Sequence, residues 1–579
     1  MKKNPLLVVM PAETQAAAIR WVNNDNLVIT VYAQQPVEND RWTITRLLGI
    51  NRQTKKFTKI LWESGGQNAA DVIWMASDGR PEIMVAAQDS IYLGDSFWPS
   101  VWRVNVETGK RNLVQQGRIE VSDWYSDAVG NIRAGVSYND SSRKFRLLYR
   151  ATGSGAFRQV DSADTRRLES LTAPFLFIPG TNHALAIHDN DAGRSAIYEV
   201  DLTTQDDIRT VYTAPADSEV VSVRLSEDGS ALLGVSYIGT TTGTVWFDPG
   251  LAQVQAAIDK SVPDRRAQIV SMNADRSRLL VLIDRADTPG ALYYFDLATD
   301  KMQRIAWQNE QLRTKPLAPV RMVHYKARDG LDIEAVLTLP ADRAAKNLPV
   351  IMLPHGGPWA QDTLDYDYWA QFLASRGYAV VQPNFRGSTG YGTAFERRGE
   401  GQLGLAMQDD VTDGLAWAVQ QGIADPKRAC IVGASYGGYA AMWGVAKDPD
   451  LYRCAVSIAG VANLRREVND FGNTMMGGKF RDDWQRMTPD FAAVSPINAV
   501  PRIKVPLLLI HGRKDLRVDY KQSDAMYRKM RAAGKVVELV PLAEADHFFQ
   551  READRVVLLN SLETFLNKYN PADPAPSVH

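Results

Sequence analysis

The first half of the chain alternates short apolar runs with polar turns, and one unit of this kind recurs. Six copies of an apolar run followed by a polar turn begin at Arg46, Val101, Arg146, Ala196, Thr244 and Leu292. A threonine marks the turn in five of these copies, at Thr54, Thr108, Thr152, Thr204 and Thr299. Further alternating runs lie between the copies, so each unit corresponds to about four short strands in ~45–50 residues.

A repeat of this length is typical of the blades of a β-propeller. One small sheet cannot bury both of its faces, whereas a ring of sheets stacks face to face and leaves few open edges. The pattern predicts a propeller over residues 1–310, with six blades between Arg20 and about Trp307 and with residues 1–19 as the remnant of an alternative seventh. One or two β-sandwiches are the competing fold, but sandwiches rarely repeat a single period this often.

The pattern changes at residues 308–319, a polar stretch containing proline that predicts a linker. Beyond it, near-continuous apolar runs such as VIMLP, ACIVGA and VPLLLIHG alternate with helical stretches such as DDVTDGLAWAVQQG. This alternation predicts an α/β-hydrolase domain with a doubly wound, mostly parallel sheet over residues 320–570. We expect the remaining tail, residues 571–579, to be disordered.

Composition and charge exclude some classes of partner. Of the 579 residues, 45% are hydrophobic and 23% are charged, and the formal net charge is −1. Such a balance, without a basic run, argues against a nucleic-acid partner. No run approaches the ~18 apolar residues of a membrane-spanning helix. The N-terminal run LLVVM is shorter than the ~7–15 apolar residues of a secretory signal, so we expect a cytoplasmic protein unless a signal was removed upstream.

Two cysteines, Cys430 and Cys454, each lie in a run that predicts a buried strand. Two cysteines cannot by themselves build a zinc site or a disulfide framework. We expect them to pack as buried free thiols, with a disulfide between neighbouring strands as the alternative. The seven histidines show no metal-ligand spacing, so the sequence implies no metal or organic cofactor.

Residues 433–437, Gly-Ala-Ser-Tyr-Gly, match the G-x-S-x-G pattern of a nucleophile elbow. The serine of such an elbow sits on a sharp strand-to-helix turn, and the flanking glycines let the backbone turn without a Cβ clash. The preceding run CIVGA predicts a strand and the following run YAAMWGVA predicts a helix. Ser435 is therefore the predicted nucleophile, and its hydroxyl needs a base to become reactive.

The order of residues along the chain selects the other members of a catalytic triad. In α/β-hydrolases the acid follows the serine, and the histidine follows the acid. Only His547 and His579 satisfy this order, and His579 ends the predicted tail. Asp515, after the strand VPLLLIHG, is the predicted acid, with Asp519 as the alternative. The acid would hold the imidazole in the right tautomer and stabilise its cation.

The oxyanion of the reaction needs preorganised donors. The backbone N–H of Tyr436, directly after the nucleophile, is one predicted donor. The second should come from residues 355–358 (HGGP), and we favour Gly357 because a glycine lets the backbone approach the substrate. A plain tight turn is the alternative there. We expect His355 to form structural hydrogen bonds rather than to act as a base.

The motifs HGGPW, NFRGSTGYG, GASYGGYAA, SPIN and HGRKDLRV together resemble the prolyl oligopeptidase family of serine peptidases. The resemblance covers the hydrolase half closely and the propeller half by architecture only. Within that family the chain looks most like the acylaminoacyl-peptidase and related dipeptidyl-peptidase group. The resemblance implies hydrolysis of peptide bonds through an acyl-enzyme, beneath a propeller that admits short peptides and excludes folded proteins.

The same resemblance implies three substrate contacts. Arg517, in the loop of the predicted acid, would bind a backbone carbonyl of the substrate through the fixed donors of its guanidinium. Val461 and Leu464 would line the pocket for the side chain before the cleaved bond, or would belong to the ordinary core. Enzymes of the dipeptidyl-peptidase IV type hold the free substrate amine with two adjacent glutamates, and no Glu-Glu dipeptide occurs in this chain.

Three functions compete at this point. The first is a peptidase for short peptides, of the acylaminoacyl or the dipeptidyl kind. The second is a carboxylesterase that acts on small acyl esters with the same triad. The third is a non-enzymatic scaffold, against which the intact order of serine, acid and histidine argues. We expect no membrane partner. The sequence does not specify the preferred substrate side chain, and it is compatible with a homo-oligomer.

Overall fold

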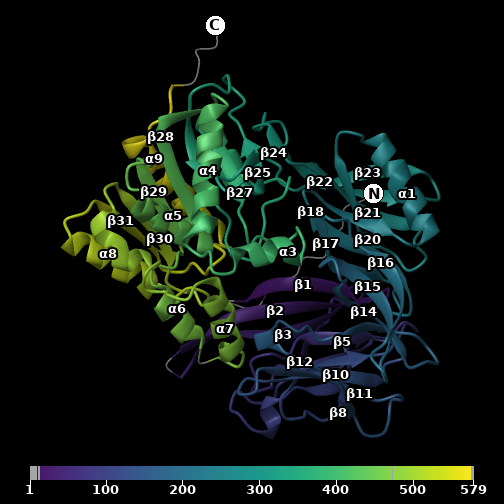
Figure 1. Ribbon diagram of the computed structural model, residues 1–579. Coiled ribbons are helices and arrows are strands. Elements are labelled where there is room, and N and C mark those ends of the chain that lie inside the picture. The colour runs from purple at the N-terminus through teal and green to yellow at the C-terminus, as the bar shows by residue number, and fades with distance from the viewer. Residues whose placement is uncertain (1–9, 11–13, 39, 473, 575–579) are drawn as a thin grey trace.

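The computed structural model describes residues 10, 14–38, 40–472 and 474–574. Within these ranges, six antiparallel sheets follow one another along the first half of the chain, and one larger mixed sheet forms the second half. Figure 1 shows the purple-to-teal blades beside the green-to-yellow second half. The predicted propeller of six blades is confirmed.

The first three blades consist of β1 (Gln15–Trp21), β2 (Asn26–Val37), β3 (Asp40–Asn51), β4 (Phe57–Ile60), β5 (Asp71–Met75), β6 (Glu82–Ala87), β7 (Ser100–Asn105), β8 (Arg111–Gln115), β9 (Val121–Ser126), β10 (Ile132–Asn139), β11 (Lys144–Tyr149) and β12 (Arg158–Asp164). The last three consist of β13 (Pro174–Phe177), β14 (His183–Asp189), β15 (Ser195–Asp201), β16 (Asp207–Thr213), β17 (Ser218–Leu225), β18 (Leu232–Gly239), β19 (Thr242–Trp246), β20 (Arg266–Met272), β21 (Arg278–Arg285), β22 (Thr288–Asp296) and β23 (Lys301–Trp307). The fifth blade has three strands among the described residues, and α1 (Pro249–Ser261) follows it. Short 3₁₀ helices occur at η1 (Asp95–Phe97) and η2 (Thr165–Arg167).

Successive blades bury their faces against each other. Between the first and second blades, Leu47 and Ile60 pack against Ile83, Val85 and Val104, all without exposed surface. Comparable clusters lie between each later pair of neighbouring blades. Because burial of one such aliphatic side chain contributes ~1.5–3 kcal/mol, the stacked ring stabilises sheets that could not fold singly.

The repeated polar turn joins the third and fourth strands of a blade, and its side chains explain the repeat. An aspartate or asparagine at the end of the third strand accepts hydrogen bonds from backbone N–H groups two or three residues later, at Asn51, Asn105, Asp201 and Asp296. The residue after the recurring threonine has a positive φ, at Lys55, Gly109, Gln205 and Asp300. The threonine pattern in the sequence therefore marks a side-chain-supported turn.

The start of the propeller corrects one expectation. Residues 15–21 form β1, which pairs with β2 in the first blade, so this part of residues 1–19 does not begin a seventh blade. Residues 1–9 and 11–13 lie outside the described residues, as do residues 575–579 of the tail. Residues 308–319 contain no helix or strand and lead from β23 to β24.

The second half forms a sheet of eight strands in the order β24-β25-β27-β26-β28-β29-β30-β31. Its first strands are antiparallel, and pairing from β27 to β31 is parallel. The strands are β24 (Val320–Lys326), β25 (Asp332–Thr338), β26 (Leu348–Met352), β27 (Ala379–Asn384), β28 (Ala424–Ala434), β29 (Cys454–Ile458), β30 (Leu507–Gly512) and β31 (Val537–Leu542). The helices are α2 (Tyr368–Ser375), α3 (Thr393–Glu396), η3 (Arg397–Gly399), α4 (Ala406–Gln420), α5 (Tyr436–Lys447), α6 (Leu464–Phe471), α7 (Gly477–Met487), η4 (Pro496–Arg502), α8 (Lys521–Ala532) and α9 (Glu552–Tyr569).

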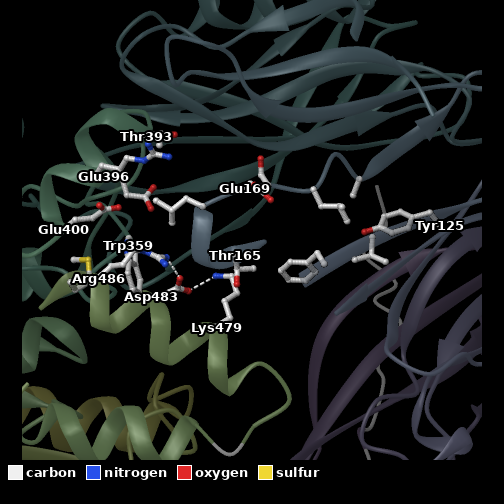
Figure 2. Close-up of a pocket in the computed structure, with 18 residues that line it drawn as sticks. Tyr125, Thr165, Glu169, Trp359, Thr393, Glu396, Glu400, Lys479, Asp483 and Arg486 are labelled. Carbon is white, nitrogen blue, oxygen red and sulfur yellow. Dashed lines mark hydrogen bonds and ion pairs between the residues drawn. The ribbon is translucent and has the colours of Figure 1, made fainter. Parts of the chain in front are cut away.

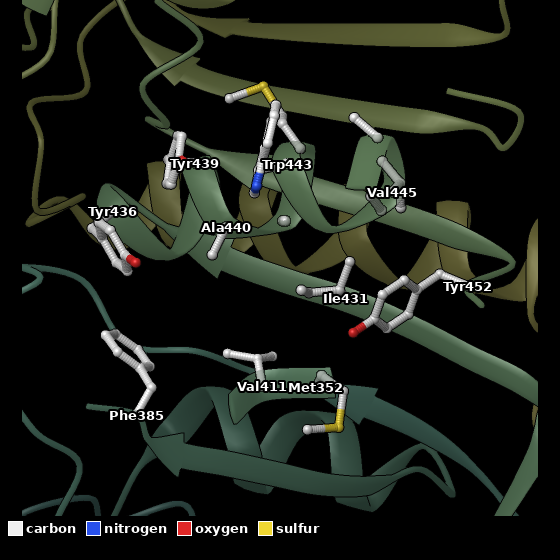
Figure 3. Close-up of a cluster of buried hydrophobic side chains, with 14 of the residues drawn as sticks. Met352, Phe385, Val411, Ile431, Tyr436, Tyr439, Ala440, Trp443, Val445 and Tyr452 are labelled. Atoms are coloured by element: carbon white, nitrogen blue, oxygen red, sulfur yellow. The ribbon is translucent and has the colours of Figure 1, made fainter. Parts of the chain in front are cut away.

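Helices cover both faces of this sheet, as the doubly wound prediction requires. Alternate residues of one strand enter different clusters: Val350 and Met352 face α4 and α5, whereas Ile351 faces α2 and α9. Figure 3 shows the first cluster, in which Tyr436 of α5 lies next to Phe385, and Tyr439 and Trp443 project from the side of α5 away from Met352. None of the helices in the described ranges is long and apolar enough to cross a bilayer.

The two cysteines form a disulfide, so the expectation of free thiols is wrong. Cys430 of β28 and Cys454 of β29 stand opposite each other in the parallel register, with their Cα atoms 4.9 Å apart. This separation is within the range that a disulfide bridges. Neither residue has exposed surface. The bond therefore links two central strands, one of which leads directly to Ser435.

Polar contacts join the propeller to the second half near α3 and α7. Arg143 forms an ion pair of 2.8 Å with Asp482 of α7. Glu219 of the fifth blade accepts hydrogen bonds from the backbone N–H groups of Gly390 and Gly392, at 2.9 and 3.1 Å. These contacts join the blades to α7 and to the segment between β27 and α4.

Candidate active site

Ser435 lies where β28 turns into α5. Its backbone has φ 57° and ψ −120°, a strained conformation for a residue with a side chain. Gly433 and Gly437 are glycines because a Cβ at either position would be too close to neighbouring backbone atoms. A Cβ on Gly433 would lie 2.4 Å from the backbone of Gly437, and a Cβ on Gly437 would lie 2.2 Å from the carbonyl oxygen of Pro354. The Ser435 side chain is partly exposed at this turn.

The predicted acid and base lie together at the ends of β30 and β31. Nδ1 of His547 is 2.7 Å from Oδ2 of Asp515. The other oxygen, Oδ1, accepts hydrogen bonds from the backbone N–H groups of Arg517 and Val518, at 2.8 and 2.9 Å. Both oxygens of this buried carboxylate are thus held, so its orientation toward the imidazole is fixed.

The Ser435 hydroxyl and His547 are not joined by a hydrogen bond within the described part of the chain. Catalytic hydrogen bonds are often unformed in a ligand-free site and tighten when the substrate binds. Ser435 and His547 are both partly exposed, and His547 stands in a loop before α9.

His511 is a residue of this site that sequence reasoning missed. It lies at the end of β30 without exposed surface. Its Nε2 is 2.9 Å from the carbonyl oxygen of Val518 and 3.3 Å from Oδ2 of Asp515, and its Nδ1 is 2.8 Å from the hydroxyl of Ser523. The only signal in the sequence is its place four residues before Asp515 in a strand end.

These imidazoles determine the charge of the acid. Burial alone would raise the pKa of Asp515, but hydrogen bonds from His511 and His547 pull it well below its usual value. Asp515 is therefore ionised in the folded chain near neutral pH. The alternative acid, Asp519, instead lies at the start of α8 and pairs with Lys521 and Arg466.

The two predicted oxyanion donors flank Ser435. Tyr436 is the first residue of α5, so its N–H has no carbonyl one turn before it. The loop of residues 355–358 approaches from the other side, since a Cβ on Gly356 would be 3.5 Å from Cβ of Ser435. Gly357 has φ 119°, a conformation open to glycine and strained for other residues.

His355 supports this loop. Its ring nitrogens contact the carbonyl oxygen of Gly356 at 2.7 Å and the hydroxyl of Ser388 at 2.9 Å. Burial lowers the pKa of His355 to about 4, so the ring is neutral near pH 7. This agrees with the expected structural role and not with a second base.

The three predicted substrate contacts have different surroundings. Arg517 is exposed in the loop of Asp515, and within the described ranges its guanidinium makes no ion pair. Val461 and Leu464 are 3% and 0% exposed and belong to the main hydrophobic cluster. The structure thus leaves Arg517 exposed in the loop of Asp515 and places Val461 and Leu464 in the hydrophobic core.

A cavity of about 620 Å³ lies between the propeller and the second half. Figure 2 shows Glu169 on the propeller side, and Trp359, Glu396 and Glu400 on the other. Trp359 directly follows residues 355–358, the loop predicted to supply an oxyanion donor, so the cavity reaches the residue next to that loop. Burial raises the pKa of Glu396, as do the nearby carboxylates of Glu219 and Asp189.

Among the described residues, no group of three or more His, Cys, Asp or Glu side chains could hold a metal ion. The groups that the structure brings together at the site are a hydroxyl, an imidazole, a carboxylate and backbone N–H groups. This set is the one used for acyl transfer.

Comparisons with known proteins agree with this chemistry. The sequence profile described as "Prolyl oligopeptidase family" matches residues 364–571. A dipeptidyl aminopeptidase BIII from Pseudoxanthomonas mexicana is 27% identical over 494 residues, which cover 82% of this chain and 70% of that protein. A human acylamino-acid-releasing enzyme is 29% identical over 231 residues, which cover 38% of this chain and 31% of that protein.

Solved structures share the fold over the whole chain. A puromycin-hydrolyzing peptidase of Mycobacterium tuberculosis has a TM-score of 0.72 at 19% identity and covers 98% of this chain and 96% of its own. The acylaminoacyl peptidase of Pyrococcus horikoshii has a TM-score of 0.67 at 17% identity, with 97% of each chain covered. These structures share the fold, and the match over residues 364–571 confirms the resemblance seen in the motifs: this part of the chain carries the domain of the prolyl oligopeptidase family.

Proposed function

We propose that this chain hydrolyses short peptides through an acyl-enzyme, with Ser435 as nucleophile, His547 as general base and Asp515 as the acid that orients it. One observation carries the proposal. The ends of three parallel strands bring a serine on a strained turn to the same edge of the sheet as an imidazole already bonded to a buried carboxylate at 2.7 Å. Such an arrangement activates a hydroxyl.

The proposed reaction follows the geometry. Oγ of Ser435 attacks the carbonyl carbon while Nε2 of His547 takes its proton, and the N–H groups of Tyr436 and Gly357 stabilise the oxyanion. His547 then gives the proton to the leaving amine, and an ester on Ser435 remains. Water, deprotonated by His547, releases the acid product. Asp515 stays ionised throughout and stabilises the imidazolium.

The substrate class is supported by the surroundings of the site. A relative matched over most of this chain is a dipeptidyl aminopeptidase, and another is an acylamino-acid-releasing enzyme. Glu169, Glu396 and Glu400 border the interdomain cavity and favour a free substrate amine over a blocked one. Arg517 would bind a backbone carbonyl of the same peptide.

A panel of chromogenic substrates tests the proposal. We expect kcat/KM to be highest for unblocked dipeptide anilides and lower for acetyl-amino-acid anilides. Simple nitrophenyl esters are measured separately. Turnover of either class of anilide supports a peptidase, and their ratio distinguishes dipeptidyl from acylaminoacyl release. Turnover of esters alone overturns the proposal in favour of a carboxylesterase.

The nucleophile is tested by substitution. Ser435→Ala should reduce kcat below about 1% of the wild-type value and abolish labelling by a fluorophosphonate, while leaving the thermal midpoint close to wild type. Ser457→Ala, at a serine of β29 outside the proposed triad, is the matched control for labelling. Retained activity in Ser435→Ala, or labelling of another residue, contradicts the assignment.

A further inference from the structure

The motif NFRGS, residues 384–388, lies at the end of β27 and is anchored by a buried ion pair. The carboxylate of Asp410, which has no exposed surface, accepts hydrogen bonds from the backbone N–H of Arg386 at 2.9 Å and from its Nε and Nη2 at 2.8 and 2.7 Å. Asp329 accepts two more hydrogen bonds from the same guanidinium. Because a guanidinium and a carboxylate that pair through two parallel hydrogen bonds have a fixed geometry, Ser388 is held in place two residues later.

The hydroxyl of Ser388 lies between two groups that can accept its proton. Ser388 has no exposed surface. Its Oγ is 2.9 Å from Nε2 of His355 and 2.6 Å from the carbonyl oxygen of Phe385. That carbonyl oxygen also accepts the backbone N–H of Ser388, at 3.0 Å. Since the carbonyl of Phe385 keeps this donor in any case, the single hydroxyl proton of Ser388 is available to the imidazole.

The imidazole of His355 needs that proton because its two nitrogens face different partners. A neutral imidazole carries one N–H and one acceptor nitrogen. Nδ1 of His355 is 2.7 Å from the carbonyl oxygen of Gly356, a group that can only accept, so the N–H belongs on Nδ1. Nε2 is then the acceptor, and Ser388 is the donor that faces it. A proton on Nε2 would instead bring the lone pair of Nδ1 against that of the carbonyl oxygen.

The contact with the Gly356 carbonyl determines where the next N–H points. The carbonyl of Gly356 and the N–H of Gly357 belong to one planar trans peptide, in which these two groups point in opposite directions. A carbonyl held against His355 therefore directs the N–H of Gly357 to the other side of the loop. The loop passes next to the nucleophile there, since a Cβ on Gly356 would lie 3.5 Å from Cβ of Ser435.

We infer that Ser388 is a positioning residue for the reaction, whose hydroxyl fixes the tautomer of His355 and thereby orients the peptide that presents the N–H of Gly357 to the oxyanion. This inference rests on the proposed function, because it explains how one of the proposed oxyanion donors is aligned. It also gives the motif NFRGS a part in the chemistry, although none of its side chains needs to touch the substrate.

Removal of the hydroxyl tests the role of Ser388. Ser388→Ala should lower kcat for the anilides by about 10-fold or more, because complete loss of an oxyanion donor costs ~10²–10³ in kcat, and KM should stay within about twofold. Ser495→Ala is the matched control: Ser495 also has no exposed surface, and its hydroxyl donates to the carbonyl oxygen of Phe491 at 2.6 Å. This control should keep kcat within about twofold of wild type. A kcat of Ser388→Ala within about twofold of wild type overturns the inference.

A double variant tests whether Ser388 acts through His355. In His355→Asn an amide N–H takes the place of the Nδ1–H and needs no proton from Ser388, so the contact with the Gly356 carbonyl can persist. Adding Ser388→Ala to His355→Asn should then lower kcat by no more than about twofold, although the same change costs about 10-fold or more in the wild type. An equal loss in both backgrounds overturns the route through His355.

The tautomer is measurable in the wild type, without any change at Ser388. Nitrogen NMR of protein labelled in its imidazoles should show a protonated Nδ1 and a bare Nε2 for the histidine whose signals disappear in His355→Asn. A protonated Nε2 on that ring overturns the inference. In that case, anilide turnover and fluorophosphonate labelling of Ser435 leave the peptidase proposal intact. Absence of turnover of every anilide by the wild type defeats both.

Discussion

At the scale of single residues, one carboxylate organises the site by facing two imidazoles. Oδ2 of Asp515 lies 2.7 Å from His547 and 3.3 Å from His511, and its other oxygen is bound by two backbone N–H groups. His511 is itself held by Ser523 and by the carbonyl oxygen of Val518. His511 cannot reach the substrate from this buried place, so it acts on the reaction through Asp515, as a positioning residue.

Replacement of His511 should therefore slow the chemical step without weakening substrate binding. In His511→Asn the Asp515 carboxylate loses one of its partners and gains freedom to rotate, and we expect kcat to fall by about 10-fold or more because small misplacements of a catalytic group are costly. KM should stay within about twofold. Steady-state measurement of kcat and KM separately checks this.

His324→Asn provides the control, because that imidazole is 66% exposed on β24. A similar loss in both variants would point to a general effect of histidine removal. A rise in KM with kcat unchanged would contradict positioning through Asp515.

At the scale of elements, the strands β28 and β29 carry both the nucleophile and its cross-link. β28 ends at Ala434, directly before Ser435, and β29 ends at Ile458, which accepts the hydrogen bond from Ser435. The disulfide joins the same two strands in register. It therefore stabilises the part of the sheet from which the elbow rises, at a distance from the chemistry itself.

The double variant Cys430→Ala, Cys454→Ala should lower stability by about 2–4 kcal/mol, since the disulfide restrains the unfolded chain and its removal also leaves space in the core. We expect kcat/KM to remain within about threefold of wild type, because neither sulfur touches the site. The thermal midpoint measures the first effect and anilide turnover the second. Two thiols that react in denaturant without a reductant would contradict the bond in the wild type.

Much of this organisation follows from local sequence, and the rest depends on which elements become neighbours. The elbow at Ser435 is predictable because the glycine spacing reports a backbone constraint, and His547 follows from chain order. The pairing of Cys430 with Cys454 depends on the adjacency of two parallel strands, which apolar runs do not specify. His511 gains its role only through a contact made in the folded chain, with Asp515. The sequence did not predict β1 as a strand of the first blade, because its residues are largely exposed and do not alternate between apolar and polar.

At the scale of the whole molecule, the propeller and the hydrolase half meet over a cavity that borders the oxyanion loop. Their contacts include the ion pair between Arg143 and Asp482 and the two backbone hydrogen bonds accepted by Glu219. Both members of the ion pair are largely buried, at 18% and 21% side-chain exposure. Contacts of this kind hold the blades over the hydrolase half, and we expect them to restrict which substrates enter.

Loosening this contact should relax the selection of substrates by size. We expect Asp482→Asn to raise kcat/KM for a ten-residue peptide about threefold or more relative to a four-residue peptide with the same cleaved bond, because a partly buried charge left without its partner weakens the interface. Asp450→Asn, which removes an exposed partner of Lys504 far from the blades, should leave the ratio unchanged. Faster proteolysis of residues 308–319 in Asp482→Asn would indicate a loosened interface. If the ratio of the two kcat/KM values is nevertheless unchanged, the interface does not select substrates by size.

The burial of the disulfide also has a consequence for how the protein is made. Because α2 and α9 cover the face of the sheet that holds both sulfurs, an oxidant can reach them only while the chain is still folding. Protein that folds in a reducing cytosol would bury Cys430 and Cys454 as free thiols. These thiols would then stay reduced when the protein is later exposed to air. Two batches of one sequence could then differ in covalent structure, and only full unfolding would make them alike.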